Sequence, residues 1–164
     1  MKILKYYTIM HIVHFYSYVY LCLSIAGQAR VCLHYRRGDF LLYDSIEKGY
    51  TVANISFVKR AMTLYRTWFD DVIFILISDG IEWCKENVRG PDITYSPFGE
   101  QYMDLALMTS CDHVIVTSGT FGWWGAWLAG GRTVYFSGYP GPNSYIESVI
   151  NRSDYYPPSW IGLH

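Results

Sequence analysis

The chain has 164 residues, a formal net charge of −1 at pH 7, 51% hydrophobic residues, 18% aromatic residues and 16% charged residues. Its length suits one domain with a sizeable core. The near-neutral charge gives no support for a protein that binds nucleic acid or an anionic membrane surface.

The first segment of the chain differs from the rest. Residues 6–26 contain no Asp, Glu, Lys or Arg, and Lys2 and Lys5 precede them. This stretch is about long enough to span a bilayer, although its histidines, tyrosines and serines are unusual in a hydrocarbon span. Its end, Ser24-Ile25-Ala26, also fits a signal-peptide cleavage site. Residues 1–28 are therefore interpreted as a signal-anchor, a signal peptide or a tyrosine-rich segment of the fold.

From residue 30 onward, β-rich runs alternate with helical patterns. The predicted strands are 31–35, 72–77, 93–96, 114–116 and, as the last one, 133–136. The predicted helices are 54–69, with Asn54 as its N-cap, 81–88, 100–110 and 121–128. Such alternation implies parallel pairing through right-handed crossovers. The predicted fold class is α/β, a Rossmann-like parallel sheet with helices on both faces, formed by residues 29–164.

The first strand ends in two adjacent arginines, a glycine and an aspartate, Arg36-Arg37-Gly38-Asp39. Strand side chains alternate, so His34 and Arg36 share one side while Arg37 points to the other. Guanidiniums at the carboxyl end of a strand, where α/β sheets bind ligands, suit a phosphorylated substrate. The alternative is an exposed turn in which the arginines pair with Asp39 or with water.

Polar residues also follow two other predicted strands, at the same edge of the sheet. Asp79 comes after residues 72–77, and Thr117-Ser118-Gly119-Thr120 leads into the helix that begins near Phe121. Free backbone N–H groups at a helix N-terminus form an anion site, although Thr120 could instead serve as the helix cap. The helix carries three tryptophans, which we expect to pack in the core: Trp123, Trp124 and Trp127.

The four cysteines are widely spaced, which argues against a zinc module and against a dense disulfide framework. A single Cys84–Cys111 bridge and buried free thiols both remain open. Two glycosylation sequons, at Asn54-Ile55-Ser56 and Asn151-Arg152-Ser153, are compatible with a lumenal domain.

Three motifs, in the same order along the chain, resemble those of the α1,2-fucosyltransferases, glycosyltransferase family 11. Residues 34–39 resemble the family's His-x-Arg-Arg-x-Asp motif. Residues 74–85 look like its strand-Ser-Asp-Asp…Trp-Cys segment. Residues 104–113 and 117–127 are similar to its Asp-Leu-x-Leu-Met…Ser-Thr-Phe-x-Trp-Trp-Gly-Ala block, which is long and specific.

This resemblance implies the donor-binding half of a GT-B glycosyltransferase. The implied reaction moves L-fucose from GDP-fucose to the 2-hydroxyl of a β-galactoside-terminated glycan, with inversion. The implied catalytic residues are Arg36, which would stabilise the negative charge on the leaving GDP, and Asp39, which would act as the base. Asp44 is the second candidate for the base. Either aspartate could instead simply pair with an arginine. The resemblance also implies a set of substrate-binding residues: His34, Arg36, Arg37, Asp79, Ser118, Thr120 and Phe121. Within this set, Arg37 would contact the phosphates and Asp79 the guanosine.

The chain contains no Asp-x-Asp motif, and we expect no metal and no cofactor beyond GDP-fucose as donor substrate. The resemblance further implies a single-pass type II protein of the Golgi membrane, with a lumenal catalytic domain anchored by the first segment.

The chain also departs from the family pattern. Gly80 stands where the family has a second aspartate. In the run before the helix, Thr117-Ser118-Gly119-Thr120 replaces the family's Ser-Asn-Ser-Thr, so that a glycine stands at position 119. Family members are usually about twice as long, so we expect the acceptor side of the cleft to be missing here or replaced. Two alternatives therefore stay open: a domain that binds GDP-fucose without transferring fucose, and a membrane-tethered domain without nucleotide affinity.

Overall fold

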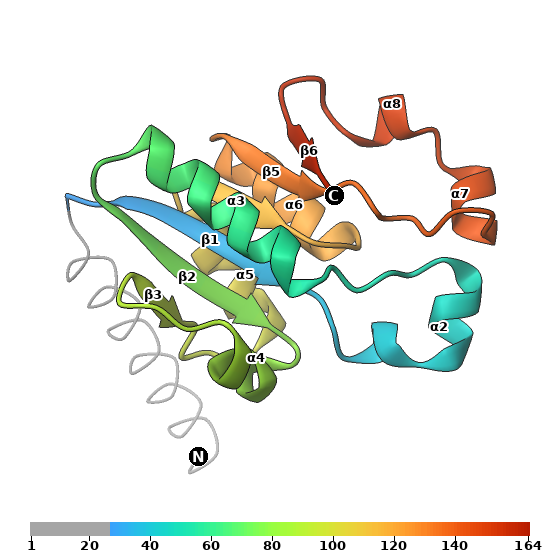
Figure 1. Ribbon diagram of the computed structural model, residues 1–164, viewed down its shortest axis with the longest axis horizontal. Coiled ribbons are helices and arrows are strands. Elements are labelled where there is room, and N and C mark those ends of the chain that lie inside the picture. Colours follow the sequence, from blue (N-terminus) through green and yellow to red (C-terminus); the bar gives the residue numbers. More distant parts are fainter. Residues whose placement is uncertain (1–26) are drawn as a thin grey trace, which may run out of the picture.

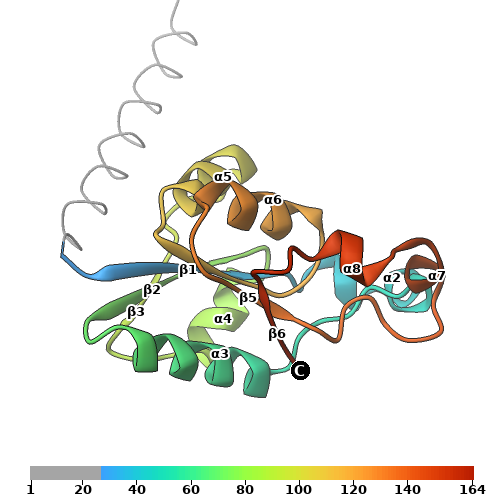
Figure 2. The ribbon, with the colours of Figure 1, turned by 90° about the horizontal axis from the view of Figure 1, so that it is seen from above.

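The computed structural model describes residues 27–164. A six-stranded, all-parallel sheet forms the middle layer, with strand order β3-β2-β1-β4-β5-β6 (Figure 1). Helices α3 and α4 cover one face of the sheet, and α5 and α6 cover the other (Figure 2). This is the doubly wound order of a Rossmann-like fold, so the predicted fold class is confirmed.

Through residue 136, the bounds of the predicted elements are close to the observed ones, while the two short helices between residues 39 and 48 were not predicted. The strands are β1 (Ala29–Tyr35), β2 (Val72–Ser78), β3 (Ile93–Tyr95), β4 (His113–Val116), β5 (Thr133–Phe136) and β6 (Ile161–Leu163). The helices are the 3₁₀ helix η1 (Asp39–Leu41), α2 (Tyr43–Lys48), α3 (Ile55–Trp68), α4 (Ile81–Asn87), α5 (Gln101–Thr109), α6 (Thr120–Ala129), α7 (Tyr145–Val149) and α8 (Arg152–Tyr155).

The prediction that residues 133–136 form the last strand is wrong. Residues 161–163 add a sixth strand, which pairs in parallel with β5 through Val134 and Ile161. Its sequence, Ile-Gly-Leu, is too short to show a period of two, and a central glycine weakens any strand signal. The strand forms because its backbone pairs with the exposed edge of β5, although its own sequence gives only a weak strand signal.

The alternation of side chains on β1 divides the core into two layers. Val31, Leu33 and Tyr35 pack in the larger cluster beneath α3 and α4. Cys32 packs with residues of β2, β4, α5 and α6 on the other face. His34 and Arg36 have the parity of Cys32, so β1 presents them toward the α5–α6 side.

Helix α6 contacts the sheet through its smallest residues. Its buried positions are Gly122, Gly125 and Ala126, whereas Trp124 and Trp127 are each 53% exposed. The expectation that these two tryptophans lie in the core is therefore wrong. A Cβ added at Gly125 would collide with the side chain of Met108 on α5, so the helix lies too close to its neighbours for an indole on that face.

Substitution of Gly122 by alanine tests this close approach. The added Cβ would lie 2.5 Å from Nδ1 of the buried His34 ring, and overpacking of this kind costs about 1–3 kcal/mol. We expect a correspondingly lower free energy of unfolding in urea, despite the better helix propensity of alanine. The control is Gly99→Ala, since a Cβ at Gly99 meets nothing within 4 Å. Equal urea midpoints for both variants would contradict the close contact between α6 and β1.

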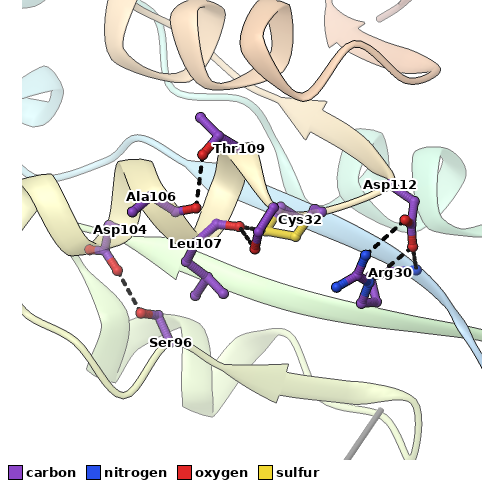
Figure 3. The surroundings of a disulfide bond; sticks show 10 residues. Arg30, Cys32, Ser96, Asp104, Ala106, Leu107, Thr109 and Asp112 are labelled. Atoms are coloured by element: carbon purple, nitrogen blue, oxygen red, sulfur yellow. Dashed lines mark hydrogen bonds and ion pairs between the residues drawn. A yellow bond between two sulfur atoms is a disulfide. The ribbon is translucent and has the colours of Figure 1, made fainter. Parts of the chain in front are cut away.

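A disulfide joins Cys32 of β1 to Cys111, just after α5, and Figure 3 shows it beneath that helix. Cys84 is a buried free thiol whose pKa is raised, chiefly by burial. Of the two alternatives left open for the cysteines, the Cys84–Cys111 bridge is wrong, because Cys84 belongs to the core layer on the α3–α4 face while Cys111 belongs to the layer on the opposite face. The sheet separates the two sulfurs.

Residues 1–26 lie outside the described part of the chain, and with them almost all of the segment predicted to anchor or to be cleaved. Among the helices of residues 27–164, none has both the length and the apolar character needed to cross a membrane.

Candidate functional site

A cleft of about 720 Å³ opens at the carboxyl edge of the sheet. The strand order reverses between β1 and β4, and open α/β sheets bind their ligands at such a switch point. The chain that leaves β1 and the chain that leaves β4 both line this cleft. Of the predicted site residues, all but Arg37 and the second candidate base, Asp44, line it: His34, Arg36, Asp39, Asp79, Ser118, Thr120 and Phe121.

Arg36 is held in the cleft by two carboxylates. Its Nη2 lies 2.9 Å from the carboxylate of Asp39 and its Nε lies 3.3 Å from Oδ2 of Asp79. Its backbone N–H donates to the hydroxyl of Thr117 over 2.9 Å. A guanidinium has five N–H donors in a fixed fork, so these pairs fix its position and leave donors for a ligand.

Arg37 points away from the cleft. Its guanidinium carbon lies 3.8 Å from the centroid of the Trp83 ring, a cation–π contact, and Trp83 in turn stacks on Tyr35. The structure therefore does not bring both guanidiniums to one ligand site, and it does not place Arg37 at the phosphate contact that the resemblance implied, because alternate side chains of β1 point to opposite faces. The Arg37 backbone N–H donates to Oδ1 of Asp79 over 2.9 Å, so Asp79 holds the turn through both oxygens.

The N-terminus of α6 faces the cleft without a side-chain cap. Gly119 is the N-cap residue, with φ of 84°, and no side chain there accepts a hydrogen bond from the helix. The interpretation of Thr120 as the cap is wrong, because Thr120 is the first helical residue. Gly119, Thr120 and Phe121 all line the cleft, which places the partial positive charge of the helix end beside it.

The two hydroxyl residues before this helix have structural roles. Thr117 accepts from the Arg36 N–H and donates to the carbonyl of His34 over 3.2 Å. Ser118 donates to the carbonyl of Thr51 over 2.6 Å. Both residues are buried, so they fasten the β4–α6 loop to its neighbours and aim the helix end at the cleft.

His34 is a neutral, buried histidine at the floor of the cleft. It is 3% exposed, and its Nδ1 has no hydrogen-bond partner among the described residues. Burial and, next, the nearby Arg36 charge lower its pKa to about 4, against a smaller opposite effect of Asp79. At neutral pH the ring therefore adds no charge to the site.

The lowered pKa of His34 predicts acid sensitivity of the fold. A histidine whose pKa is lower in the folded state binds its proton more weakly there, so its contribution is complete above pH 6.5 and is lost as the pH falls toward about 4. The loss reaches about 3 kcal/mol. Urea unfolding between pH 7 and pH 4 should show it, and His34→Asn should flatten the profile. An equally steep profile in that variant would assign the sensitivity to other groups.

Asp104 is a cleft residue that the sequence analysis did not single out. It lies in the first turn of α5 and lines the cleft with Phe98 and Phe121. The hydroxyl of Ser96 donates to its Oδ1 over 2.5 Å (Figure 3), and burial raises the pKa of its carboxyl. The signal in the sequence was a single carboxylate within the apolar helical run Asp-Leu-Ala-Leu-Met.

The two candidate bases are placed differently. Asp39 lines the cleft with its side chain 52% exposed and paired with Arg36. Asp44 is exposed on α2 and is not a lining residue. Within residues 27–164, no three His, Cys, Asp or Glu side chains gather in a way that could hold a metal ion.

Comparison with known proteins places this geometry in a family context. The model of a family described as "Glycosyl transferase family 11" matches residues 14–164. The chain is 35% identical over 157 residues to galactoside alpha-(1,2)-fucosyltransferase 1 of Homo sapiens, an alignment that covers 86% of this chain and 43% of that protein. It is also 35% identical over 139 residues to the protein of that name from Saimiri boliviensis boliviensis, covering 82% of this chain and 38% of that one. The chain thus spans less than half the length of these curated relatives.

Two solved structures share the fold. One is NodZ alpha-1,6-fucosyltransferase co-crystallized with GDP, with a TM-score of 0.50 over 76% of this chain and 43% of that chain. The other is NodZ soaked with GDP-fucose, with a TM-score of 0.52 over 78% of this chain and 46% of that chain. The sequence identity is 16% in both cases.

Proposed function

Because the chain belongs to glycosyltransferase family 11, we propose that its cleft binds GDP-fucose and that it transfers L-fucose to the 2-hydroxyl of a β-galactoside-terminated glycan, with inversion. The observation that carries the proposal is the meeting of Arg36 with the uncapped N-terminus of α6 in one cleft. The names of the curated relatives support the same transferred sugar, acceptor class and linkage, and the NodZ structure soaked with GDP-fucose supports the donor.

Arg36 and α6 have complementary roles in this proposal. Negative charge builds on the diphosphate as the bond to fucose breaks, and donors fixed in advance stabilise that charge most effectively. The remaining N–H groups of Arg36 supply charge-assisted hydrogen-bond donors, while the first amides of α6 supply oriented dipoles. This arrangement can balance the charge of a leaving diphosphate without a metal ion.

We assign base recognition to Asp104 rather than to Asp79. The Asp79 carboxylate already accepts from the Arg37 N–H and pairs with Arg36. Asp104 instead presents a half-buried carboxylate in the cleft, which Phe98 and Phe121 also line. The Watson–Crick edge of guanine carries N–H groups that can donate hydrogen bonds to a carboxylate. Flat aromatic rings can stack on the faces of a base.

Substitution of Asp104 by asparagine tests this assignment. The amide keeps the size of the side chain but replaces one acceptor oxygen by a donor. We expect GDP affinity to fall about 10-fold to 100-fold, as for a lost hydrogen bond to a charged group, while the affinity for inosine diphosphate, which lacks the 2-amino group, falls less. Isothermal calorimetry measures both. Asp92→Asn is the control, since Asp92 pairs with Arg66 and does not line the cleft; equal losses for the two nucleotides would refute the assignment.

A second candidate function is GDP-fucose binding without transfer. It is favoured by the ion pair between Asp39, the first candidate base, and Arg36. Incubation with radiolabelled GDP-fucose and a simple β-galactoside separates the two functions. Transfer of label supports the enzyme, GDP binding without transfer supports the binding domain, and absence of GDP binding contradicts both.

We further propose that residues 29–164 form the donor-binding domain and that residues 1–28 place it in the Golgi lumen as a single-pass type II protein. The Cys32–Cys111 disulfide supports a lumenal location, because disulfides persist in oxidising compartments. Protease digestion of intact Golgi vesicles should leave the domain protected. Digestion without added detergent would contradict this placement.

A further inference from the structure

We propose that Asn54 is the acceptor of an N-linked glycan, attached through its Nδ2 at the first residue of the Asn54-Ile55-Ser56 sequon. The inference rests on the lumenal location proposed above, and it does not depend on fucosyl transfer. Its evidence is the way in which the folded chain uses one end of the Asn54 amide and leaves the other end exposed.

The oxygen of the Asn54 side chain is the end that the fold uses. Asn54 is the N-cap of α3, and its Oδ1 accepts the backbone N–H of Phe57 over 2.8 Å and the hydroxyl of Ser56 over 2.6 Å. A backbone N–H needs an acceptor, so this bond fixes which end of the amide is oxygen. Nδ2 is the atom that a glycan would occupy, and in the described part of the chain it makes no hydrogen bond. A glycan on Nδ2 therefore leaves the helix cap intact.

The position on the molecule also tolerates a large substituent. Asn54 and Ser56 are both exposed, and Lys59 and Arg60 beyond them are exposed as well. Helix α3 covers the face of the sheet opposite α5 and α6 (Figure 2). Asn54 is not among the residues that line the cleft. A glycan at this position leaves the proposed nucleotide site open.

The second sequon lacks this freedom. The Nδ2 of Asn151 donates to the carboxylate of Asp154 over 2.9 Å. The middle residue of this sequon, Arg152, donates to the carbonyls of Ser137, Tyr139 and Pro140 over 2.7–2.9 Å. The Asn151 sequon is thus engaged in holding α8 against the segment after β5, and a glycan there would disturb the Nδ2 contact.

The modification is a transfer from a lipid-diphosphate-linked oligosaccharide. Nδ2 of Asn54 attacks the anomeric carbon of the first sugar, forming a C–N bond as the C–O bond to the diphosphate breaks. The lipid diphosphate leaves with the electron pair of that bond. One proton of the amide is lost to a base of the transferase.

The test expresses the full chain in human cells behind a cleavable secretory signal, so that entry into the lumen does not depend on residues 1–28. Peptide-N-glycosidase treatment in ¹⁸O water, followed by peptide mass spectrometry, should convert Asn54 to labelled aspartate. Asn54→Asp, which keeps a good N-cap, and Ser56→Ala, which leaves Asn54 in place, should each remove the glycan. Asn151→Asp should leave it.

Two results would overturn the proposal: a secreted chain in which Asn54 is unlabelled, or a glycan that survives both Asn54→Asp and Ser56→Ala. GDP calorimetry on the same preparations keeps this test separate from that of the proposed function. We expect Asn54→Asp to bind GDP as the unmodified sequence does, so a chain that carries the glycan but binds no GDP would contradict the proposed function alone.

Discussion

The substitution Arg36→Ala should remove most of the GDP affinity of the chain. A charge-assisted hydrogen bond contributes about 1.5–3 kcal/mol, which corresponds to a loss of roughly 10-fold to 100-fold in Kd. The two carboxylates that now pair with Arg36, those of Asp39 and Asp79, would then face the diphosphate without compensation and repel it. If the chain transfers fucose, the rate should fall further, by about 10²–10³, since leaving-group charge is greatest in the transition state.

The neighbouring arginine supplies the matched control. Arg37→Ala removes the same charge one residue away, but the Arg37 guanidinium lies on the Trp83 ring outside the cleft. Its effect on GDP affinity should be much smaller. Arg36→Lys should retain part of the affinity, because lysine keeps the charge and loses the planar fork. Calorimetry with GDP checks all three variants; equal losses for Arg36→Ala and Arg37→Ala would contradict the assignment of the phosphate contact to Arg36.

Removal of the Cys32–Cys111 disulfide should destabilise the domain strongly. The bond closes a segment with a sequence separation of 79, for which the chain-entropy model gives about 4.5 kcal/mol. We expect the double variant Cys32→Ala, Cys111→Ala to unfold at a lower urea concentration than the oxidised protein, with a loss of about 2–5 kcal/mol.

Reductant provides the internal control for this experiment. Dithiothreitol should lower the urea midpoint of the wild-type protein and leave that of the double variant unchanged, since Cys84 is a free thiol in both. Peptide mapping without reduction should find Cys32 and Cys111 linked. A wild-type midpoint that does not respond to reductant, or a linked peptide containing Cys84, would refute the pairing.

The sequence predicted the sheet because its strong signals agree with one another. The apolar run of β2 indicates a strand buried on both faces, and the strand–helix alternation implies parallel crossovers. The carboxyl edge of such a sheet is where ligands bind, which is why His34, Asp79 and Thr120 line one cleft. The same alternation on β1 places Arg36 and Arg37 on opposite sides of the strand, although the family resemblance implied that both contact the phosphates.

The errors arose where tertiary packing decides the outcome. The exposure of Trp124 and Trp127 follows from the close approach of α6 to Met108 and His34, which only glycine permits. The pairing of Cys111 depends on which face of the sheet each sulfur occupies, and spacing along the chain does not report that. Asp104 was not selected because its importance comes from its proximity to the cleft and to Ser96.

The most direct test of the account is a crystal structure of the full chain with GDP. We expect the diphosphate to accept hydrogen bonds from the Arg36 guanidinium and from the backbone N–H groups at Thr120 and Phe121, with the guanine against Asp104. A diphosphate bound away from Arg36 or from the N-terminus of α6 would contradict it.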